Sequence, residues 1–265
     1  MIVGRDITVV IPAYNAEKTI VRAIESICSQ TLTPHRVIVV DDNSTDATPD
    51  LVRTLQQKHH GLLIECLSNV ENLGPGESRN RGWDIVETYW TAFLDSDDAW
   101  HPRKLEIQIG ILNLHPNIEV LCTETKLGDE SNWNQYQVMT SPSLQNLEFR
   151  QLLFKNRIPT RSVILKTSIT HRFPRGLSED FKLWLTLSKG GSTIVKINQP
   201  LAIHFREEYS AGGISSKIFR HQIFELKAIF SFFRKNPILI SIAGMFSVLK
   251  FFRRVFIFQL RRLRP

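Results

Sequence analysis

The sequence predicts an α/β protein with a mostly parallel sheet, because strand-like and helix-like segments alternate along its first half. Short apolar runs alternate with amphipathic segments along the first 125 residues. Runs of about four to eight apolar residues are typical of buried strands, whereas apolar residues every three or four positions indicate helices. Strands that alternate with helices are joined by right-handed crossovers, which leave neighbouring strands parallel. We therefore expect helices layered on a central sheet.

The elements of the first half follow this alternation in order. Residues 7–12 (ITVVIP) form an apolar run typical of a buried strand, and in residues 17–30 Ile20, Ile24 and Ile27 share one helical face. Further strands are expected at 37–40, 62–67, 90–95 and 118–122. Further helices are expected from the capping residues Ser44 or Thr45 to about Lys58, over 76–88, and after Pro102, which suits a helix start.

The alternation is weaker between about Gly128 and Lys155 and in the segments that follow. Residues 144–154 are expected to be helical, and 178–189 form a second helix that Ser178 can cap. Strands are expected at 162–166 and 192–197. We therefore predict that this half adds a mixed sheet along one edge of the first half.

The overall composition is that of an ordinary globular protein. The chain has 265 residues, of which 42% are hydrophobic and 22% charged, which excludes disordered and fibrous classes. Its cysteines, Cys28, Cys66 and Cys122, are too few for a disulfide framework, and none lies in a CxxC pair that would support structural zinc. The first residues show no secretory signal. These features predict a reducing, cytoplasmic location.

Residues 217–265 differ in composition from the rest of the chain. They hold eleven Lys or Arg against one acid, Glu225, and ten of the sixteen Phe, so we place a boundary near residue 216. The uncharged run 237–249 is shorter than the roughly 20 residues of a membrane-spanning helix. A basic, Phe-rich amphipathic segment favours a helix lying on anionic lipid, which predicts peripheral association with the inner face of the cell membrane. The alternative is a helix pair packed on the rest of the chain or on a second copy in a homodimer. Nucleic acid is not expected, because no recognised module is present.

Polar clusters follow three of the predicted strands. They are PAYN at 12–15, DDNSTD at 41–46 and DSDD at 95–98. Ligands of parallel sheets bind at the carboxyl ends of the strands, so these clusters are expected to share one site. Carboxylates this close together suit Mg²⁺ or Mn²⁺, with substrate phosphates completing the coordination. A solvated acidic turn is the alternative.

The segment NLGPGESRNRG at 72–82 combines glycines with two arginines. Gly74 and Gly76 permit tight turns beside a ligand, and Arg79 and Arg81 can bind phosphate at a helix start. The segment is not a P-loop, because GxxxxGK[ST] is absent. A dinucleotide-dependent dehydrogenase is also disfavoured, because no GxGxxG follows the first strand.

Taken together, five stretches resemble family-2 glycosyltransferases of the GT-A fold. They are VVIPAYN (9–15), VDDNSTD (40–46), NLGPGESRNRG (72–82), FLDSDD (93–98) and SEDFKLW (178–184). They occur in the family's order over roughly residues 6–210. The resemblance implies a Rossmann-related mixed sheet flanked by helices within a catalytic domain at 1–216. Its nucleotide-binding half is about 1–125 and its acceptor-binding half about 126–216, and a helical tail follows at 217–265.

The resemblance also implies an activity and a set of site residues. Similar proteins move a sugar from a nucleotide-diphosphate sugar to an acceptor hydroxyl and invert the anomeric centre. They use Mg²⁺ or Mn²⁺, and UDP is the nucleotide expected here. On the nucleotide side, the resemblance implies that the pocket is lined by Pro12, Ala13, Tyr14 and Glu17, and that Asp41, supported by Asp42, accepts a hydrogen bond from the base. Arg79 is implied to hold the base and the diphosphate side. Asp95 is implied to lie near the ribose and the metal, Asp97 to bind the metal, and Asp180 to be the general base.

Some of these residues have structural alternatives. An acid in the first turn, such as Asp180, also complements a helix dipole. His204 is a further metal-ligand candidate, although a histidine in an apolar strand is more often a core residue. We predict a hexosyltransferase that acts on a glycan or lipid-linked acceptor in surface polysaccharide synthesis, of the lipopolysaccharide O-antigen kind. A nucleotidyltransferase and a non-catalytic nucleotide-sugar-binding relative are the alternatives.

Overall fold

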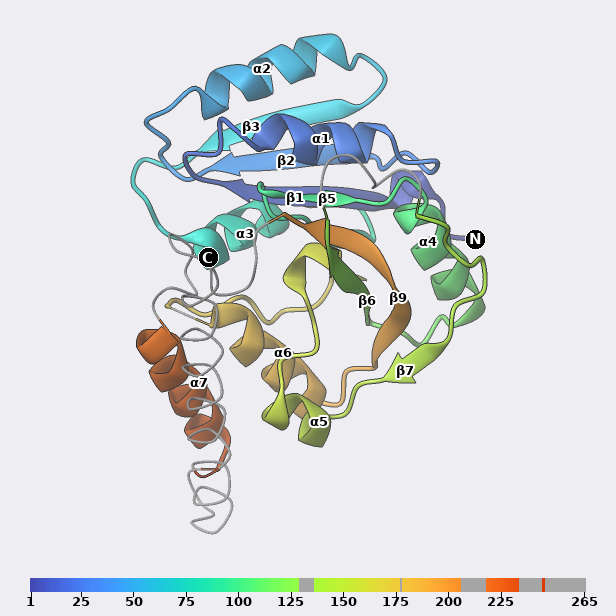
Figure 1. The fold of residues 1–265 in the computed structure, drawn as a ribbon, viewed down its shortest axis with the longest axis vertical. Coiled ribbons are helices and arrows are strands. Elements are labelled where there is room, and N and C mark those ends of the chain that lie inside the picture. Colours follow the sequence, from blue (N-terminus) through green and yellow to red (C-terminus); the bar gives the residue numbers. More distant parts are fainter. Residues whose placement is uncertain (129–135, 177, 206–217, 234–244, 246–265) are drawn as a thin grey trace, which may run out of the picture.

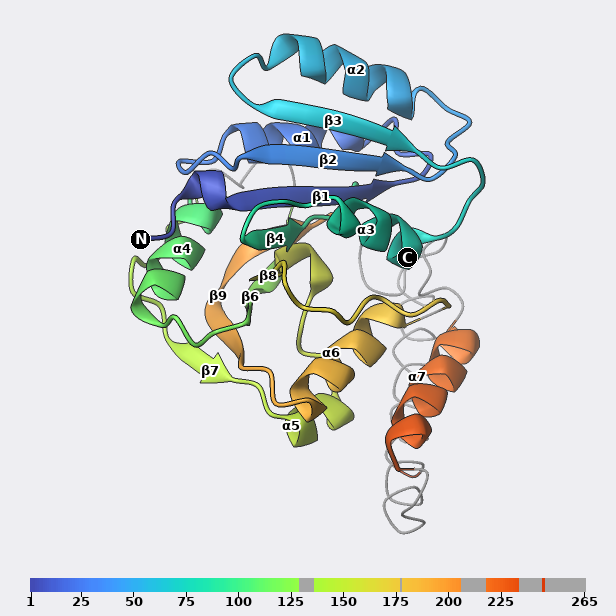
Figure 2. The same cartoon turned by 180° about the vertical axis from the view of Figure 1, so that it is seen from behind.

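The computed structural model describes residues 1–128, 136–176, 178–205, 218–233 and 245. Within these residues, nine strands form one sheet in the order β3-β2-β1-β4-β8-β6-β9-β5, and β7 pairs with β9 (Figures 1 and 2). The strands are β1 (Ile7–Ala13), β2 (Arg36–Asp41), β3 (Leu63–Ser68), β4 (Trp90–Phe93), β5 (Asp98–Trp100), β6 (Val120–Leu127), β7 (Leu144–Asn146), β8 (Ile164–Lys166) and β9 (Ile194–His204).

The sheet is parallel in its first half and mixed in its second. β1 pairs in parallel with β2 and β4, and β2 with β3. β8 joins β4 and β6 in antiparallel fashion, β9 runs parallel to β6, and β5 runs antiparallel to β9. This arrangement confirms the predicted α/β fold with a mixed sheet.

Helices cover both faces of the sheet. They are α1 (Ile20–Cys28), α2 (Thr48–Lys58), α3 (Pro75–Asp84), α4 (Lys104–Leu114), α5 (Phe149–Phe154), α6 (Glu179–Lys189) and α7 (Ile218–Phe233). Alternate side chains of a strand point to opposite faces. Accordingly, Val9 packs with α1, α2 and α4 in one core, whereas Val10 packs with α3 and α6 in the other. Figure 1 shows α1 and α2 on one side of the sheet and α3 on the opposite side.

Gly82 sets the closest approach of α3 to the sheet. A Cβ at this position would lie 2.5 Å from Cγ1 of Val10 and 3.1 Å from Cγ2 of Val40. Real side chains essentially never approach this closely, so only glycine lets α3 rest directly on β1 and β2. This contact holds the last turn of α3 against β1 and β2.

Several element boundaries differ from the sequence predictions. α2 begins at Thr48 rather than at Ser44 or Thr45, because residues 43–46 turn back toward the end of β1 and Asp46 accepts from the Thr48 amide at 3.0 Å. The helix expected over 144–154 is divided: β7 pairs with β9, and α5 starts only at Phe149. Ser178 precedes α6 in a left-handed conformation, and its hydroxyl makes no capping bond.

α7 packs against the second half of the sheet domain. Its Ile229 is only 3% exposed and belongs to the same core as α6, and Phe232 meets Phe149 of α5 edge to face at 5.7 Å. Lys189, at the end of α6, donates to the Phe232 carbonyl at 3.1 Å. The predicted boundary near residue 216 and, apart from residue 245, the tail beyond Phe233 lie outside the described residues. None of the described helices combines the length and the apolar character needed to cross a membrane.

Candidate functional site

The three predicted polar clusters lie at one edge of the sheet. β2, β1 and β4 are adjacent and parallel, so the loops that follow them leave the sheet on the same side. The Asp42 amide donates to the Ala13 carbonyl at 2.7 Å, and the Leu94 amide to the Val10 carbonyl at 3.2 Å. The pairing therefore continues to the point where each polar cluster begins.

The loops after β1 and β2 are locked together by side-chain bonds. Asn15, which has a positive φ of 47°, donates its amide to Ser44 Oγ at 2.9 Å and accepts from the Thr45 amide at 2.8 Å. Glu17 donates its amide to Asp46 Oδ2 at 3.0 Å.

The residues expected to line the nucleotide pocket differ in their exposure. The Tyr14 side chain is 51% exposed, and Glu17 is exposed as well. Pro12 and Ala13 are buried in β1. Tyr14 and Glu17 thus offer side chains to a ligand, whereas Pro12 and Ala13 shape the strand end.

The two acids at the end of β2 have different surroundings. Asp42 is 2% exposed and accepts from the amides of Leu73 and Gly74, at 2.9 and 2.8 Å, and from the Asn69 side chain at 2.6 Å. Asp41 is also buried, and both of its oxygens lie 3.4 Å from the Ser44 amide. Asp42 therefore holds the loop that leads into α3, which leaves Asp41 as the acid with fewer protein hydrogen bonds.

Arg79 links the two halves of the protein. Its Nη2 lies 2.5 Å from Asp95 Oδ1, at the end of β4, and its Nη1 lies 3.3 Å from Glu179 Oε1, at the start of α6. Its side chain is only 7% exposed. Burial alone would lower the pKa of Arg79, but Asp95 and Glu179 outweigh it and raise the pKa. Arg79 is therefore a permanent buried cation between two carboxylates.

Asp95 lies between two guanidinium groups. Arg161, in the 3₁₀ turn Thr160–Ser162, has its Nε 4.0 Å from Asp95 Oδ2 and its Nη1 3.1 Å from Asp98 Oδ2. Burial opposes ionisation of Asp95, but Arg79 and Arg161 together lower its pKa. Burial raises the pKa of Asp98 well above its usual range in spite of Arg161, and the charges on Asp95 and Asp97 raise it further. Asp95 is thus the acid of this pair that stays ionised.

Asp180 lies in the first turn of α6, next to Glu179. Its Oδ2 accepts from the Asn156 side chain at 2.9 Å, and its Oδ1 accepts from the Phe181 amide at 2.7 Å. Burial is the largest influence on its pKa and raises it, although these two donors and Arg79 oppose the change. Burial and the charge of Asp180 raise the pKa of Glu179 as well. An ionised carboxylate with a raised pKa is a stronger base than an ordinary aspartate.

The structure adds residues that the sequence analysis did not identify. Arg161 and Asn156 contact the predicted acids from a part of the chain without a matching motif. Arg22 of α1 donates to the Asp97 carbonyl at 2.8 Å, and its guanidinium lies 3.7 Å from the centre of the Phe205 ring. Sequence spacing offers no signal for these residues, because their partners lie on other elements.

The acid loop suits a hard divalent cation. Asp95 and Asp97 are half-buried and provide carboxylate oxygens, and Asp98 pairs with His204 across β5 and β9. In the part of the chain that is described, Asp95, Asp97 and His204 do not bring three ligand atoms within 4.8 Å of one another. Mg²⁺ is typically held by one or two carboxylates, with substrate phosphates and water as the other ligands. Asp95 and Asp97, in the loop between β4 and β5, fit that description, and His204 lies opposite Asp98 where β9 pairs with β5.

Comparison with known proteins identifies the family of the chain. The model for Glycosyl transferase family 2 matches residues 8–178. The UDP-Glc:alpha-D-GlcNAc-diphosphoundecaprenol beta-1,3-glucosyltransferase WfaP of Escherichia coli is 30% identical over 220 residues, which cover 82% of each protein.

Two solved structures show the same fold. One is Staphylococcus aureus TarS 1–349 in complex with UDP-GlcNAc, with a TM-score of 0.67, 20% identity and coverage of 95% of this chain and 73% of that one. The other is the mannosyltransferase PcManGT of Pyrobaculum calidifontis in complex with GDP-Man and Mn²⁺, with a TM-score of 0.66, 18% identity and coverage of 91% and 69%. The match to the family model covers more than half of the chain. The protein therefore belongs to glycosyl transferase family 2, a family of sugar-transferring enzymes.

Proposed function

We propose that this protein moves a hexose from a nucleotide-diphosphate sugar to a hydroxyl of a lipid-linked saccharide or growing glycan, with inversion at the anomeric carbon. The observation that carries the proposal is the bridge made by Arg79. It joins Asp95, at the edge where the nucleotide loops meet, to Glu179, the neighbour of Asp180. The donor-side acids and the basic carboxylate therefore belong to one cluster.

UDP is the nucleotide that we propose for the donor. WfaP is named for UDP-Glc, and TarS was solved with UDP-GlcNAc. PcManGT was solved with GDP-Man, so GDP-linked sugars are the alternative donors to include in the test below. In this chain Asp41 accepts from the base, Tyr14 and Glu17 flank it from the exposed end of the first loop, and Arg79 supports the diphosphate side.

The proposed reaction is a single displacement. Asp180 accepts the proton of the acceptor hydroxyl, and the resulting oxygen forms its bond to the anomeric carbon from the face opposite the diphosphate. The bond between that carbon and the phosphate oxygen breaks, and the nucleoside diphosphate leaves with the electron pair. Asn156 and the Phe181 amide orient the Asp180 carboxylate. When bound by Asp95 and Asp97, with His204 as a further ligand, Mg²⁺ or Mn²⁺ supplies positive charge beside the diphosphate.

We place this activity in surface polysaccharide synthesis at the cytoplasmic face of the membrane. The acceptor named for WfaP is a diphosphoundecaprenol-linked GlcNAc. The basic, Phe-rich segment 217–265 of this chain suits the surface of an anionic membrane.

Liposome flotation tests the membrane association. Because α7 packs on α5 and α6, the truncation that leaves this packing intact removes residues 234–265. The full chain should float with anionic vesicles and the truncated chain should not. Equal flotation of both chains would contradict the association, and a dimer that persists without lipid would support the homodimer instead.

A panel of nucleotide sugars, with and without Mn²⁺, tests the proposed function. A donor that binds only the folded protein raises the melting temperature, and the rise grows with the logarithm of donor concentration once the site is saturated. UDP-hexoses should give the largest shift, and only with Mn²⁺. The donor found in this way is then supplied with a diphosphoundecaprenol-linked acceptor, and the anomeric configuration of the product is determined by NMR. Retention of configuration would overturn the proposed mechanism, and nucleotidyl transfer without sugar transfer would favour the nucleotidyltransferase. Detection of sugar transfer would exclude the alternative that the protein binds nucleotide sugars without catalysing a reaction.

A further inference from the structure

Glu25, Cys28 and His59 form a second cluster of ligand-type side chains. Glu25 and Cys28 lie one turn apart on α1, and His59 is the residue that ends α2. Helices of a βαβ unit run back from the carboxyl edge of the sheet, so their last residues lie at the opposite edge from the acids. The cluster is therefore separate from the proposed donor site.

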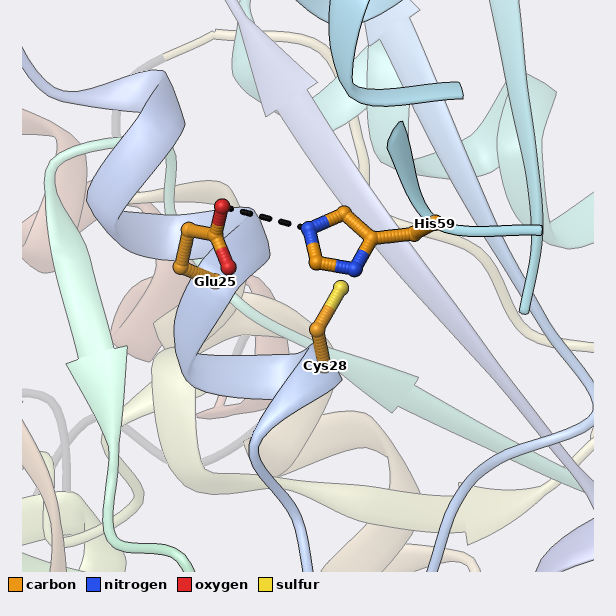
Figure 3. A group of neighbouring side chains, drawn as sticks. All are labelled: Glu25, Cys28 and His59. Atoms are coloured by element: carbon orange, nitrogen blue, oxygen red, sulfur yellow. Dashed lines mark hydrogen bonds and ion pairs between the residues drawn. The ribbon is translucent and has the colours of Figure 1, made fainter. Parts of the chain in front are cut away.

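The three side chains face one another. His59 Nε2 lies 3.1 Å from Glu25 Oε1, and the other ring nitrogen faces the Cys28 sulfur (Figure 3). One ligand atom from each residue lies within 4.8 Å of the other two, and all three side chains are half-buried. The ligands of a tetrahedral zinc ion lie roughly 3.3–3.8 Å apart, given bond lengths of about 2.0–2.3 Å. Binding one ion would require side-chain rotations, because an imidazole offers one nitrogen to a metal, and Glu25 contacts Nε2 of His59 whereas Cys28 faces the other ring nitrogen.

The electrostatics of the cluster favour a cation. Cys28 is the last residue of α1 and His59 directly follows α2, so the negative ends of two helix dipoles meet there. The Lys58 ammonium already lies 2.6 Å from Glu25 Oε1, and the Lys58 side chain is largely exposed to solvent. Burial opposes ionisation of Glu25, but Lys58 and His59 together lower its pKa. Glu25 is therefore a carboxylate at neutral pH.

The same features exclude a nucleophilic thiol. Burial and the nearby Glu25 charge raise the pKa of Cys28 to about 11. A reactive cysteine requires a lowered pKa, as found at the positive end of a helix, whereas Cys28 lies at the negative end. A metal ion deprotonates a coordinating thiol directly, so the raised pKa is compatible with a metal site.

We propose that Glu25, Cys28 and His59 bind a zinc ion that fastens α1 to α2, with water as the fourth ligand. A mixed sulfur, nitrogen and oxygen set suits zinc and disfavours Mg²⁺. Binding releases the Cys28 proton to solvent and displaces the Lys58 ammonium from Glu25. The two helices follow the locked loops after β1 and β2, so the ion would stabilise the fold behind the nucleotide edge.

The test uses the full chain, freed of metal with a chelator and then given one equivalent of ZnCl₂ or CoCl₂. Zinc should remain bound through desalting and raise the melting temperature, and cobalt should give the near-ultraviolet band of a thiolate ligand. Cys28→Ser and His59→Gln should lose zinc retention and the cobalt band. Cys66→Ser, which alters a half-buried cysteine on β3, should keep both.

Two more variants sharpen the outcome. Asp97→Asn, at the other edge of the sheet, should leave the cobalt band unchanged. Lys58→Ala should bind zinc more tightly, because no ammonium competes for Glu25. A parent chain that elutes without zinc, or a folded Cys28→Ser variant that retains the cobalt band, would overturn the proposal.

Discussion

The guanidinium of Arg79 lies 2.5 Å from the carboxylate of Asp95, although the first residue lies on α3 and the second follows β4. The ion pair is buried and is reinforced by Glu179 of α6. A buried charge is stable only when it is paired, so these three elements depend on one another for their placement.

Replacing Arg79 with Met should destabilise the fold strongly. Removing one partner of a buried ion pair typically costs about 3–5 kcal/mol, because the remaining charges stay buried. Without Arg79 the pKa of Asp95 and of Glu179 should rise, so the loss of stability should shrink as the pH falls and these acids become protonated. Urea unfolding at several pH values measures both effects. Arg150→Met, which alters an exposed arginine of α5, is the control and should change stability little.

Replacing Asp180 with Asn should abolish most sugar transfer without loss of donor binding. General-base catalysis contributes about 10²–10⁴-fold, and asparagine cannot accept the proton. Steady-state kinetics should show the loss in kcat, while the donor-induced melting shift stays the same. Asp50→Asn, on the exposed face of α2, serves as the control. A variant that transfers sugar as fast as the parent would contradict the role of Asp180.

The raised pKa of Asp180 also predicts a pH dependence. Only the ionised carboxylate accepts a proton, so kcat/KM should rise with pH along a limb that lies above the range of an ordinary aspartate. Asn156 stabilises the ionised form, so Asn156→Ala should shift this limb to higher pH and leave the plateau rate nearly unchanged. A rate lowered equally at every pH would indicate a structural defect instead. Asn198→Ala, which removes an exposed bond to Ser143, is the control.

Replacing Asp42 with Ala should loosen the loop before α3. Three donors would lose a charged acceptor, and hydrogen bonds to charged groups contribute about 1.5–3 kcal/mol each. Water that enters the space would offset part of this destabilisation, so we expect the free energy of unfolding, measured with urea, to fall by roughly 2–4 kcal/mol. The donor-induced melting shift should fall as well, because Arg79 is carried by the same helix. Unchanged stability would show that the loop is held by other contacts.

Chelation should stop sugar transfer, and Mn²⁺ or Mg²⁺ should restore it. A metal ion contributes several kcal/mol by stabilising charge on the leaving diphosphate, which corresponds to about a hundredfold or more. Asp97→Asn should show the same loss and require more Mn²⁺ for half-maximal rate. Full activity in the presence of a chelator would contradict the metal's role.

The parallel half of the sheet was predictable because β1, β2 and β4 are buried on both faces. Such strands read as continuous apolar runs, as at 7–12 and 37–40, and the right-handed crossovers between them leave them parallel. β7 was missed because residues 144–146 become a strand only by pairing with β9, far away in the sequence. Arg161 and Asn156 were missed for a related reason. Each meets its acid partner only after β8 and α6 have packed, and neither lies in a recognisable motif.

α6 carries Asp180 in its first turn and Lys189, which holds the Phe232 carbonyl of α7, at its other end. The helix is a stiff rod of about 16 Å, given a rise of about 1.5 Å per residue. α6 therefore connects the proposed base at its first turn to α7 at its last turn. A deletion that includes α7 would therefore remove a packing partner from the helix that carries the proposed base, whereas a deletion that begins at residue 234 would keep it.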